Sequence, residues 1–258
     1  MTVSVRDLAV VTRFDARLFW RDRAALSTSV LLFLGLGIGL PLLMDKLRPG
    51  SLDLLVDQHV GVLAMVLVIS TFNQIAVTVT ARRDQLLLKR LRTTGLGDGS
   101  IVGGEVGNLV LQSTLLAAVI SGVLYATTSL PVPRDLLLFA LAVVLGSAVL
   151  CLLGVAFTPL VPRAELAAVM VMPFFMLAGL GSGGFGPMTQ LLPDWAGTLL
   201  GFLPTSAMAE LIRVAYAADG TLAGDLSAAA VPALNLAVWT AIALLTITRW
   251  FRWEPRRP

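Results

Sequence analysis

The stretch LLLFALAVVLGSAVLCLLGVAFTPLV, residues Leu136–Val161, runs without a single charged side chain. A helix needs about 20 apolar residues to cross a hydrocarbon core of about 30 Å. In lipid the backbone must satisfy its own hydrogen bonds, so such runs are interpreted as spanning helices. The sequence therefore predicts an all-α integral membrane protein with six transmembrane helices in one membrane domain, residues 1–258. The five further runs are Ala24–Met44, Val60–Ala81, Val102–Ala126, Leu166–Ser182 and Ala228–Thr248.

The basic residues divide unequally between the two faces that six spans define. Fifteen of the nineteen Lys and Arg residues fall on the face that holds both termini. Because cytoplasmic loops carry an excess of Lys and Arg, the N and C termini are expected in the cytoplasm. Charged residues make up only 14% of the chain, against about a quarter in soluble proteins. We expect a multi-pass protein of a bacterial plasma membrane, with its basic residues beside anionic membrane lipid and no nucleic acid as partner.

The segment before the first span, residues 1–23, is predicted to form an amphipathic helix in the cytoplasmic membrane surface. Its apolar residues recur at helical spacing, and arginines gather on a neighbouring face. The alternative is a solvated positive flank that only orients the first span. The candidate residues of this interface helix are Leu8, Phe14, Arg17, Leu18 and Arg21.

The loop between the second and third spans, residues 82–101, is long and basic for a simple connection. Its first half is predicted to form one helix that ends near Gly95, with cations on one face and leucines on the other. Such a helix can seat its apolar face in a groove of a soluble partner. The candidate docking residues are Arg82, Leu87, Lys89, Leu91 and Arg92 here, and Pro162, Arg163 and Glu165 in the shorter loop after the fourth span.

The opposite face is expected to carry an acidic loop, Asp45–Gln58, and a broken segment, residues 183–214. Pro173 interrupts the fifth run, and the glycines and prolines that follow leave only short apolar pieces. Apolar pieces of about 10–14 residues fit re-entrant or interfacial helices better than spans. Short re-entrant helices are therefore predicted between the fifth and sixth spans.

Three parts of the chain resemble the permeases of the ABC-2 type transporter family, in particular the daunorubicin-resistance type of drug exporter. They are residues 16–25 (ARLFWRDRAA), residues 82–96 (RRDQLLLKRLRTTGL) and the Gly- and Pro-rich break before the last span. The second is the most specific, although Gly95 stands where the family usually has proline. The resemblance implies a permease that dimerises, with a second copy or a homologous permease, and is driven by separate ABC ATPase subunits.

The resemblance implies export across the plasma membrane, and the apolar spans suit an amphipathic or hydrophobic small molecule as cargo. The sequence contains no G-x-x-x-x-G-K-[ST] phosphate loop, so ATP and Mg²⁺ are expected on the partner and no cofactor on this chain. One histidine and one cysteine make a metal site or catalytic site improbable, so a non-enzymatic transport subunit is expected. The alternative, a self-contained secondary transporter or channel, usually carries ionisable residues near the midplane, and these spans are nearly free of charge.

Small, polar and aromatic residues within the spans are candidates for the translocation path or for the contact with a second permease. Two glycines four residues apart in the first span permit close helix approach, across a dimer or within the chain. Glu105 is interpreted as a switch or as the partner of an arginine. Glu210 and Arg213 are interpreted as a gate or as a simple helix pair. The path candidates are Gly35, Gly39, Asn73, Gln74, Phe174, Phe175 and Met176.

Overall fold

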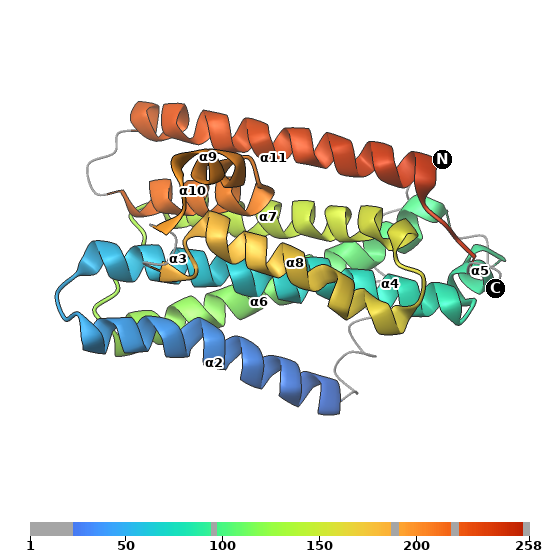
Figure 1. The fold of residues 1–258 in the computed structure, drawn as a ribbon, viewed down its shortest axis with the longest axis horizontal. Helices are drawn as coiled ribbons and strands as arrows, with labels where there is room; N and C mark the ends of the chain where they lie inside the picture. Colours follow the sequence, from blue (N-terminus) through green and yellow to red (C-terminus); the bar gives the residue numbers. More distant parts are fainter. Residues whose placement is uncertain (1–22, 94–96, 187–190, 218–221, 255–258) are drawn as a thin grey trace.

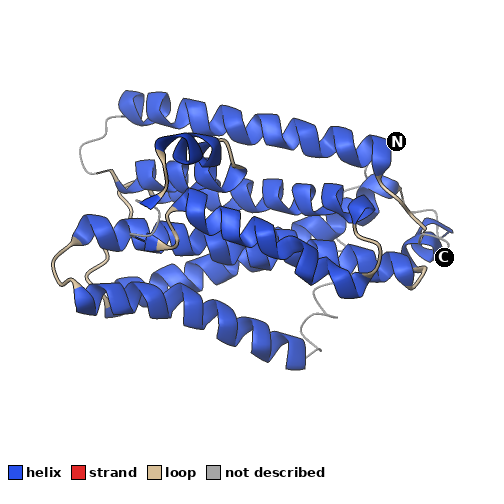
Figure 2. Cartoon of the chain, viewed as in Figure 1, coloured by secondary structure: helices blue, strands red, loops and turns tan. Residues whose placement is uncertain are grey.

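The computed structural model describes residues 23–93, 97–186, 191–217 and 222–254, and in these ranges every regular element is a helix (Figure 2). The predicted all-α class is therefore confirmed. The elements are α2 (Arg23–Leu47), α3 (Leu52–Val68), the π-helix η1 (Ile69–Asn73), α4 (Gln74–Asp84), α5 (Leu87–Thr93), α6 (Asp98–Thr127), α7 (Leu136–Phe157), the 3₁₀ turn η2 (Thr158–Leu160), α8 (Ala164–Ser182), α9 (Asp194–Gly201), α10 (Pro204–Tyr216) and α11 (Leu222–Trp250).

Five helical stretches of the described residues are long and apolar enough to cross a membrane, and the bent pair α9–α10 would make a sixth. The five coincide with the second to sixth predicted runs. The first predicted run lies in α2, a helix of 25 residues, which at about 1.5 Å per residue is about 37 Å long. Each predicted apolar run is thus found as a helix of membrane-spanning length.

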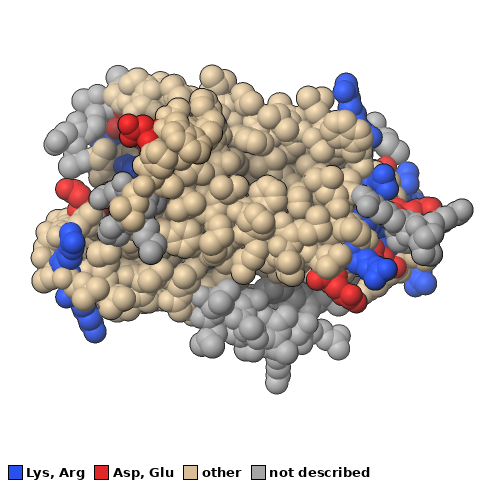
Figure 3. All heavy atoms as spheres, in the orientation of Figure 1, with Lys and Arg blue, Asp and Glu red and all other residues tan. Residues whose placement is uncertain are grey.

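The long helices lie side by side along the longest axis of the molecule (Figure 1). On the face shown in Figure 3, the charged side chains gather at the two ends and leave an uncharged belt between them. The stretch α3–η1–α4 runs through the middle of the bundle, and every residue from Gln58 to Val68 is buried. Below, the α5 end is the end of the bundle that carries α5, and the α9 end is the opposite one, with α9 and α10 (Figure 1).

The connection between α2 and α3 is shorter than predicted. The expected loop Asp45–Gln58 is helical at both sides, and only Arg48–Ser51 lies outside the helices. Asp53 stands in the first turn of α3, where a carboxylate stabilises a helix by interacting with its dipole. The acidic residues of this region therefore lie within helices, with Asp53 at the start of α3, and do not extend a loop.

Helix α8 was expected to be interrupted at Pro173, but it continues through this residue to Ser182. It ends where Gly183 adopts the left-handed conformation, with φ +86°. The predicted short helices before the last span are confirmed as α9 and α10, whose axes differ by 84°. The fold therefore breaks at the glycines after α8 and not at the proline inside it.

The predicted single helix through residues 82–93 is wrong, because it breaks after Asp84. Helix α4 ends there, and Leu86 takes the left-handed conformation with φ 58° before α5 begins. The Leu86 amide donates to the Arg83 carbonyl three residues earlier, a tightened last turn typical of helix ends. The break turns the short helix α5 away from the direction of α4.

Candidate functional site

Arg83, the second-to-last residue of α4, is buried at the α5 end, with 2% of its side-chain surface exposed. Its guanidinium donates to the carbonyls of Thr158 at 3.1 Å and Val161 at 2.9 Å, and more weakly to Pro162 at 3.4 Å. Thr158 directly follows α7, close to the negative end of the dipole of that helix, and its carbonyl also accepts from the Val161 amide. One side chain thus fastens α4 to the loop between α7 and α8.

Asp84 makes the complementary contact to the other side of the same loop. Its carboxylate accepts from the Ala164 amide at 3.0 Å, which is the first residue of α8. An anion is favourable at a helix N-terminus, as a cation is at a C-terminus. The neighbouring residues Arg83 and Asp84 therefore bridge the end of α7 and the start of α8, and the two predicted docking loops form one connected unit.

Arg82 is held by Glu105 of α6, with 2.6 Å between Arg82 Nη1 and Glu105 Oε2. The two side chains are only 15% and 6% exposed, so water screens the pair little. Of the two interpretations of Glu105, pairing with an arginine is the one that the structure shows. Arg82 thus contacts its own bundle and is not displayed on the surface as a docking residue.

The apolar side of α5 faces its own bundle. Leu88 is 3% exposed and belongs to a buried cluster with Ile75, Val79 and Val155, against which Leu91 also packs. Leu87 and Leu91 are half-buried. The expectation that the leucine face lies open to a partner is therefore wrong for Leu88, because the break at Leu86 folds this face inward. The surface left to a partner is mainly polar on α5, with Leu86 exposed at its start.

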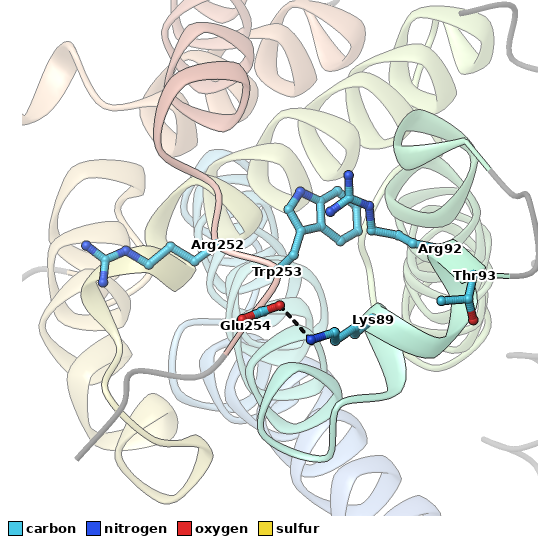
Figure 4. A pocket seen from close by; sticks show the side chains of 6 residues that line it. All are labelled: Lys89, Arg92, Thr93, Arg252, Trp253 and Glu254. Atoms are coloured by element: carbon cyan, nitrogen blue, oxygen red, sulfur yellow. Dashed lines mark ion pairs between the residues drawn. The ribbon is translucent and has the colours of Figure 1, made fainter.

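The polar side of α5 borders a cleft formed with the segment after α11 (Figure 4). Lys89 Nζ lies 2.9 Å from Glu254 Oε1. The Arg92 guanidinium lies 4.7 Å from the ring centroid of Trp253, and its Nε is 2.9 Å from Asp98 Oδ1. Cation–π stacking of this kind is worth about 0.5–1 kcal/mol at an exposed site. Lys89 and Arg92 thus join α5 to the C-terminal segment of the chain.

The shorter predicted docking loop lies beside this region. Arg163 and Glu165 are exposed, and Pro162 is half-buried. Arg163 precedes the first turn of α8, in which Glu165 stands. The structure therefore leaves these two charged side chains accessible on a loop whose backbone is fixed by Arg83 and Asp84. The interface-helix candidates Leu8, Phe14, Arg17, Leu18 and Arg21 lie outside the described residues.

An apolar pocket of ≈ 250 Å³ lies between the middle of α3–η1 and helices α7, α8, α10 and α11. Three of its lining residues, Phe72, Phe157 and Phe174, form a cluster with ring centroids 5.2 to 5.7 Å apart. Phe72 is 6% exposed and Phe174 is 42% exposed, so the cluster reaches from the core to the surface. Pockets for drug-sized ligands hold about 300–1,000 Å³, so this one fits a ring or a short hydrocarbon chain.

The other path candidates are distributed over the bundle. Phe175 packs against the main core and Met176 is 45% exposed. Asn73 ends the π-helix and Gln74 begins α4. The buried Asn73 Oδ1 has no hydrogen-bond partner in the described part of the chain. The structure thus gathers Phe174 alone of these residues into the apolar pocket.

Gly35 and Gly39 of α2 face away from their own bundle. A Cβ atom at Gly35 or Gly39 would meet nothing within 4 Å, whereas at Gly37 it would come 2.7 Å from Ile120. Close packing of α2 inside the chain therefore uses Gly37. Of the two interpretations of Gly35 and Gly39, contact within the chain finds no support among the described residues.

At the α9 end, Arg213 does more than pair with its helix neighbour Glu210. Its Nε lies 2.8 Å from Asp57 Oδ1 of α3, and its Nη2 donates to the Ser182 carbonyl at 2.8 Å. The contact with Glu210 is longer, at 3.5 Å. Arg213 therefore joins α10 to the start of α3 and to the end of α8.

Sequence reasoning missed the contributions of Arg83, Asp84, Trp253 and Phe72. The adjacent Arg-Asp pair at the end of a span was a signal for helix-terminus contacts on both sides of a loop. No motif or helical period in the sequence pointed to a contact of Trp253 with α5. For Phe72 the sequence offered no signal, because its position depends on the π-helix.

The site thus consists of a connected loop unit at one charged end of a multi-pass bundle, and of an apolar pocket within the uncharged belt. No curated protein matches the chain. The model of one family, the ABC-2 family transporter proteins, matches residues 39–248, which cover most of the sequence and nearly all of the bundle described above. The chain belongs to the ABC-2 family of transporter proteins, and it is a multi-pass membrane permease of the ABC type.

Proposed function

We propose that this permease exports a hydrophobic or amphipathic small molecule, powered by ATP that binds to separate ATPase subunits together with Mg²⁺. In this proposal the chain itself carries out no chemical reaction. The α5 end faces the cytoplasm of a bacterial cell, and a second permease, identical or homologous, completes the membrane domain. The family membership supports the partnership with ATPase subunits.

The observation that carries the proposal is the bridge made by Arg83 and Asp84. Arg83 and Asp84 bond to the residues after α7 and to the start of α8. A movement of α5 or of the loop before α8 would therefore act on α7 and on α8 together. Helices α7 and α8 both line the apolar pocket. Force applied by a soluble subunit at the α5 end would thus reach the walls of the pocket through rigid helices.

The pocket supports apolar cargo. Its lining is made of leucine, valine, alanine, proline, phenylalanine and tryptophan, with Thr205 as a polar exception. The exposed Phe174 and Leu177 open it toward the bilayer side of the chain. A molecule already dissolved in the membrane would enter with its ring or chain first, and its polar part would remain outside the ≈ 250 Å³ pocket.

Reconstitution tests the proposal directly. The permease is co-expressed with each ABC ATPase subunit of its source genome, purified, and placed in liposomes with a lipophilic fluorescent dye. We expect one ATPase to co-purify, and dye movement to require ATP hydrolysis by that subunit. Dye transport by the purified permease without any ATPase would overturn the proposal and establish the secondary-transporter alternative.

A further inference from the structure

The segment after the last span, Phe251–Glu254, packs back onto α5. Its Phe251 and Trp253 rings are 4.8 Å apart at 77° and pack against the buried cluster that contains Leu88. Trp253 also lies beneath the Arg92 guanidinium. The segment is thus anchored by aromatic packing and does not extend freely from the end of α11.

This packing creates a cleft that neither element has alone. Lys89, Arg92 and Thr93 from α5 and Arg252, Trp253 and Glu254 from the C-terminal segment line it. Figure 4 shows Trp253 and Arg92 stacked in the middle, with the ion pair of Lys89 and Glu254 beside them. Arg252 is exposed and extends on the other side of the segment from Arg92.

Cations outnumber acids in the cleft, even though Lys89 pairs with Glu254 and Arg92 pairs with Asp98 beside it. Three of its six lining residues are cations and one is an acid. Lys89 and Glu254 are 58% and 60% exposed, so their mutual attraction is weak and each can exchange its partner for another. A cationic cleft with an aromatic ring at its floor is complementary to carboxylates on the surface of a partner protein.

We propose that the segment Phe251–Glu254 and α5 together form a docking cleft for an acidic segment of the ATPase subunit. The inference rests on the proposed function, and it adds the extreme C-terminal part of the permease to the coupling surface. Trp253 positions Arg92, and the cations set the rate and the orientation of docking. Exposed charges at the rim of an interface act mainly on the association rate.

Two substitutions with opposite expected effects test the cleft. Arg252→Glu reverses the charge of one exposed cation, and Glu254→Gln removes the negative charge of the acidic residue that lines the cleft. Association of the purified ATPase subunit, identified as above, is measured on permease held in phosphatidylcholine nanodiscs at low salt. We expect association roughly tenfold slower with Arg252→Glu and faster with Glu254→Gln, and both effects should shrink at high salt.

The matched control is Arg249→Glu, the same charge change in the last turn of α11. Arg249 is exposed but does not line the cleft, so its variant should associate nearly as the wild type does. Equal slowing by Arg249→Glu and Arg252→Glu would overturn the inference in favour of general charge attraction.

A second arm separates protein from lipid. Slowing by Arg252→Glu that occurs only in nanodiscs with added phosphatidylglycerol would show that the cleft takes lipid phosphates, against the inference. Equal association of wild type and Arg252→Glu would also overturn it, while leaving the proposed function intact. Absence of any ATPase that binds the wild-type permease would instead overturn the proposed function and this inference with it.

Discussion

The two ends of the bundle are held together by different means. At the α5 end, side chains cross between elements: Arg83 to three carbonyls, Asp84 to an amide and Lys89 to Glu254. At the α9 end the tightest contact is between two backbones. A Cβ atom at Gly61 would lie 2.4 Å from the Gly184 nitrogen, and Gln58 donates to the Gly184 carbonyl at 3.0 Å.

The difference indicates how each end can respond to force. Backbone in contact with backbone leaves no side chain that can move aside, so the turn after α8 and the start of α3 move as one body. Side-chain contacts can lengthen, rotate or change partner. Side-chain contacts thus hold the end where we propose that a soluble subunit acts, whereas the far end adds a rigid backbone contact to side-chain contacts such as those of Arg213.

The comparison of the two ends depends on which side of the membrane each one faces. Labelling of introduced cysteines from outside the cell gives an all-or-none answer. A cysteine at Ser51, in the short loop of the α9 end, should react with an impermeant maleimide in intact cells. One at Thr93, exposed at the end of α5, should react only after permeabilisation. The native Cys151 is buried and gives little background. Labelling of Thr93→Cys from outside would reverse the orientation.

The largest stability effect is expected from Arg83→Met, which breaks the α5 end at its buried centre. The change leaves the carbonyls of Thr158 and Val161 without their charged donor, at a cost of about 3 kcal/mol or more. Thermal unfolding in detergent measures the loss. Arg90→Met, an exposed position on α5, is the control and should change the stability by less than about 0.5 kcal/mol. Equal losses of stability in Arg83→Met and Arg90→Met would show that the hydrogen bonds of Arg83 do not stabilise the α5 end more than an exposed arginine does.

A smaller loss, of about 1–3 kcal/mol, is expected from Gly61→Ala at the α9 end. The added methyl group would meet the backbone of Gly183 and Gly184, which cannot yield as a flexible side chain does. Gly122→Ala on α6 meets nothing within 4 Å and should leave stability unchanged or slightly raised. If the Gly61→Ala variant had the same unfolding temperature as the wild type, the backbone at the α9 end would be able to move apart and accept the methyl group, against the comparison.

The smallest effect is expected from Lys89→Ala. Because the pair with Glu254 is more than half exposed, its loss should change the free energy of unfolding by less than about 1 kcal/mol. The same variant should lower ATPase association more at low salt than at high salt. A large loss of stability would show that this surface pair supports the α5 end in the same way as Arg83.

The sequence predicted the helices well because each span is governed by one strong requirement. An uncharged run such as Leu136–Val161 has to be a helix in lipid, whatever it contacts. The short helices before the last span were also predictable, because prolines and glycines there leave no run long enough to cross. The error at Pro173 arose from treating a proline as a break, although membrane helices tolerate it.

The site was less predictable, because it depends on where the helices break. A single left-handed residue, Leu86, precedes α5, in which Leu88 faces inward, and no local rule selects a leucine for this conformation. Arg82, Lys89 and Arg92 read as one cationic face. The structure gives them three different partners, Glu105, Glu254 and Asp98, on two other elements. Long-range pairing of this kind is invisible in helical periodicity.

The π-helix η1 has a consequence for the distant α5 end. A π turn contains one residue more than an α turn, so it offsets the rest of the helix by about 100° around its axis. Arg82 and Arg83 lie about ten residues beyond this extra residue, on the same continuous helical stretch. Removing it would turn both side chains about a quarter of the way around the axis, away from Glu105 and from the carbonyls that follow α7. The rotation of the side chains that hold the loop unit at the α5 end is thus set by a one-residue insertion buried inside the bundle.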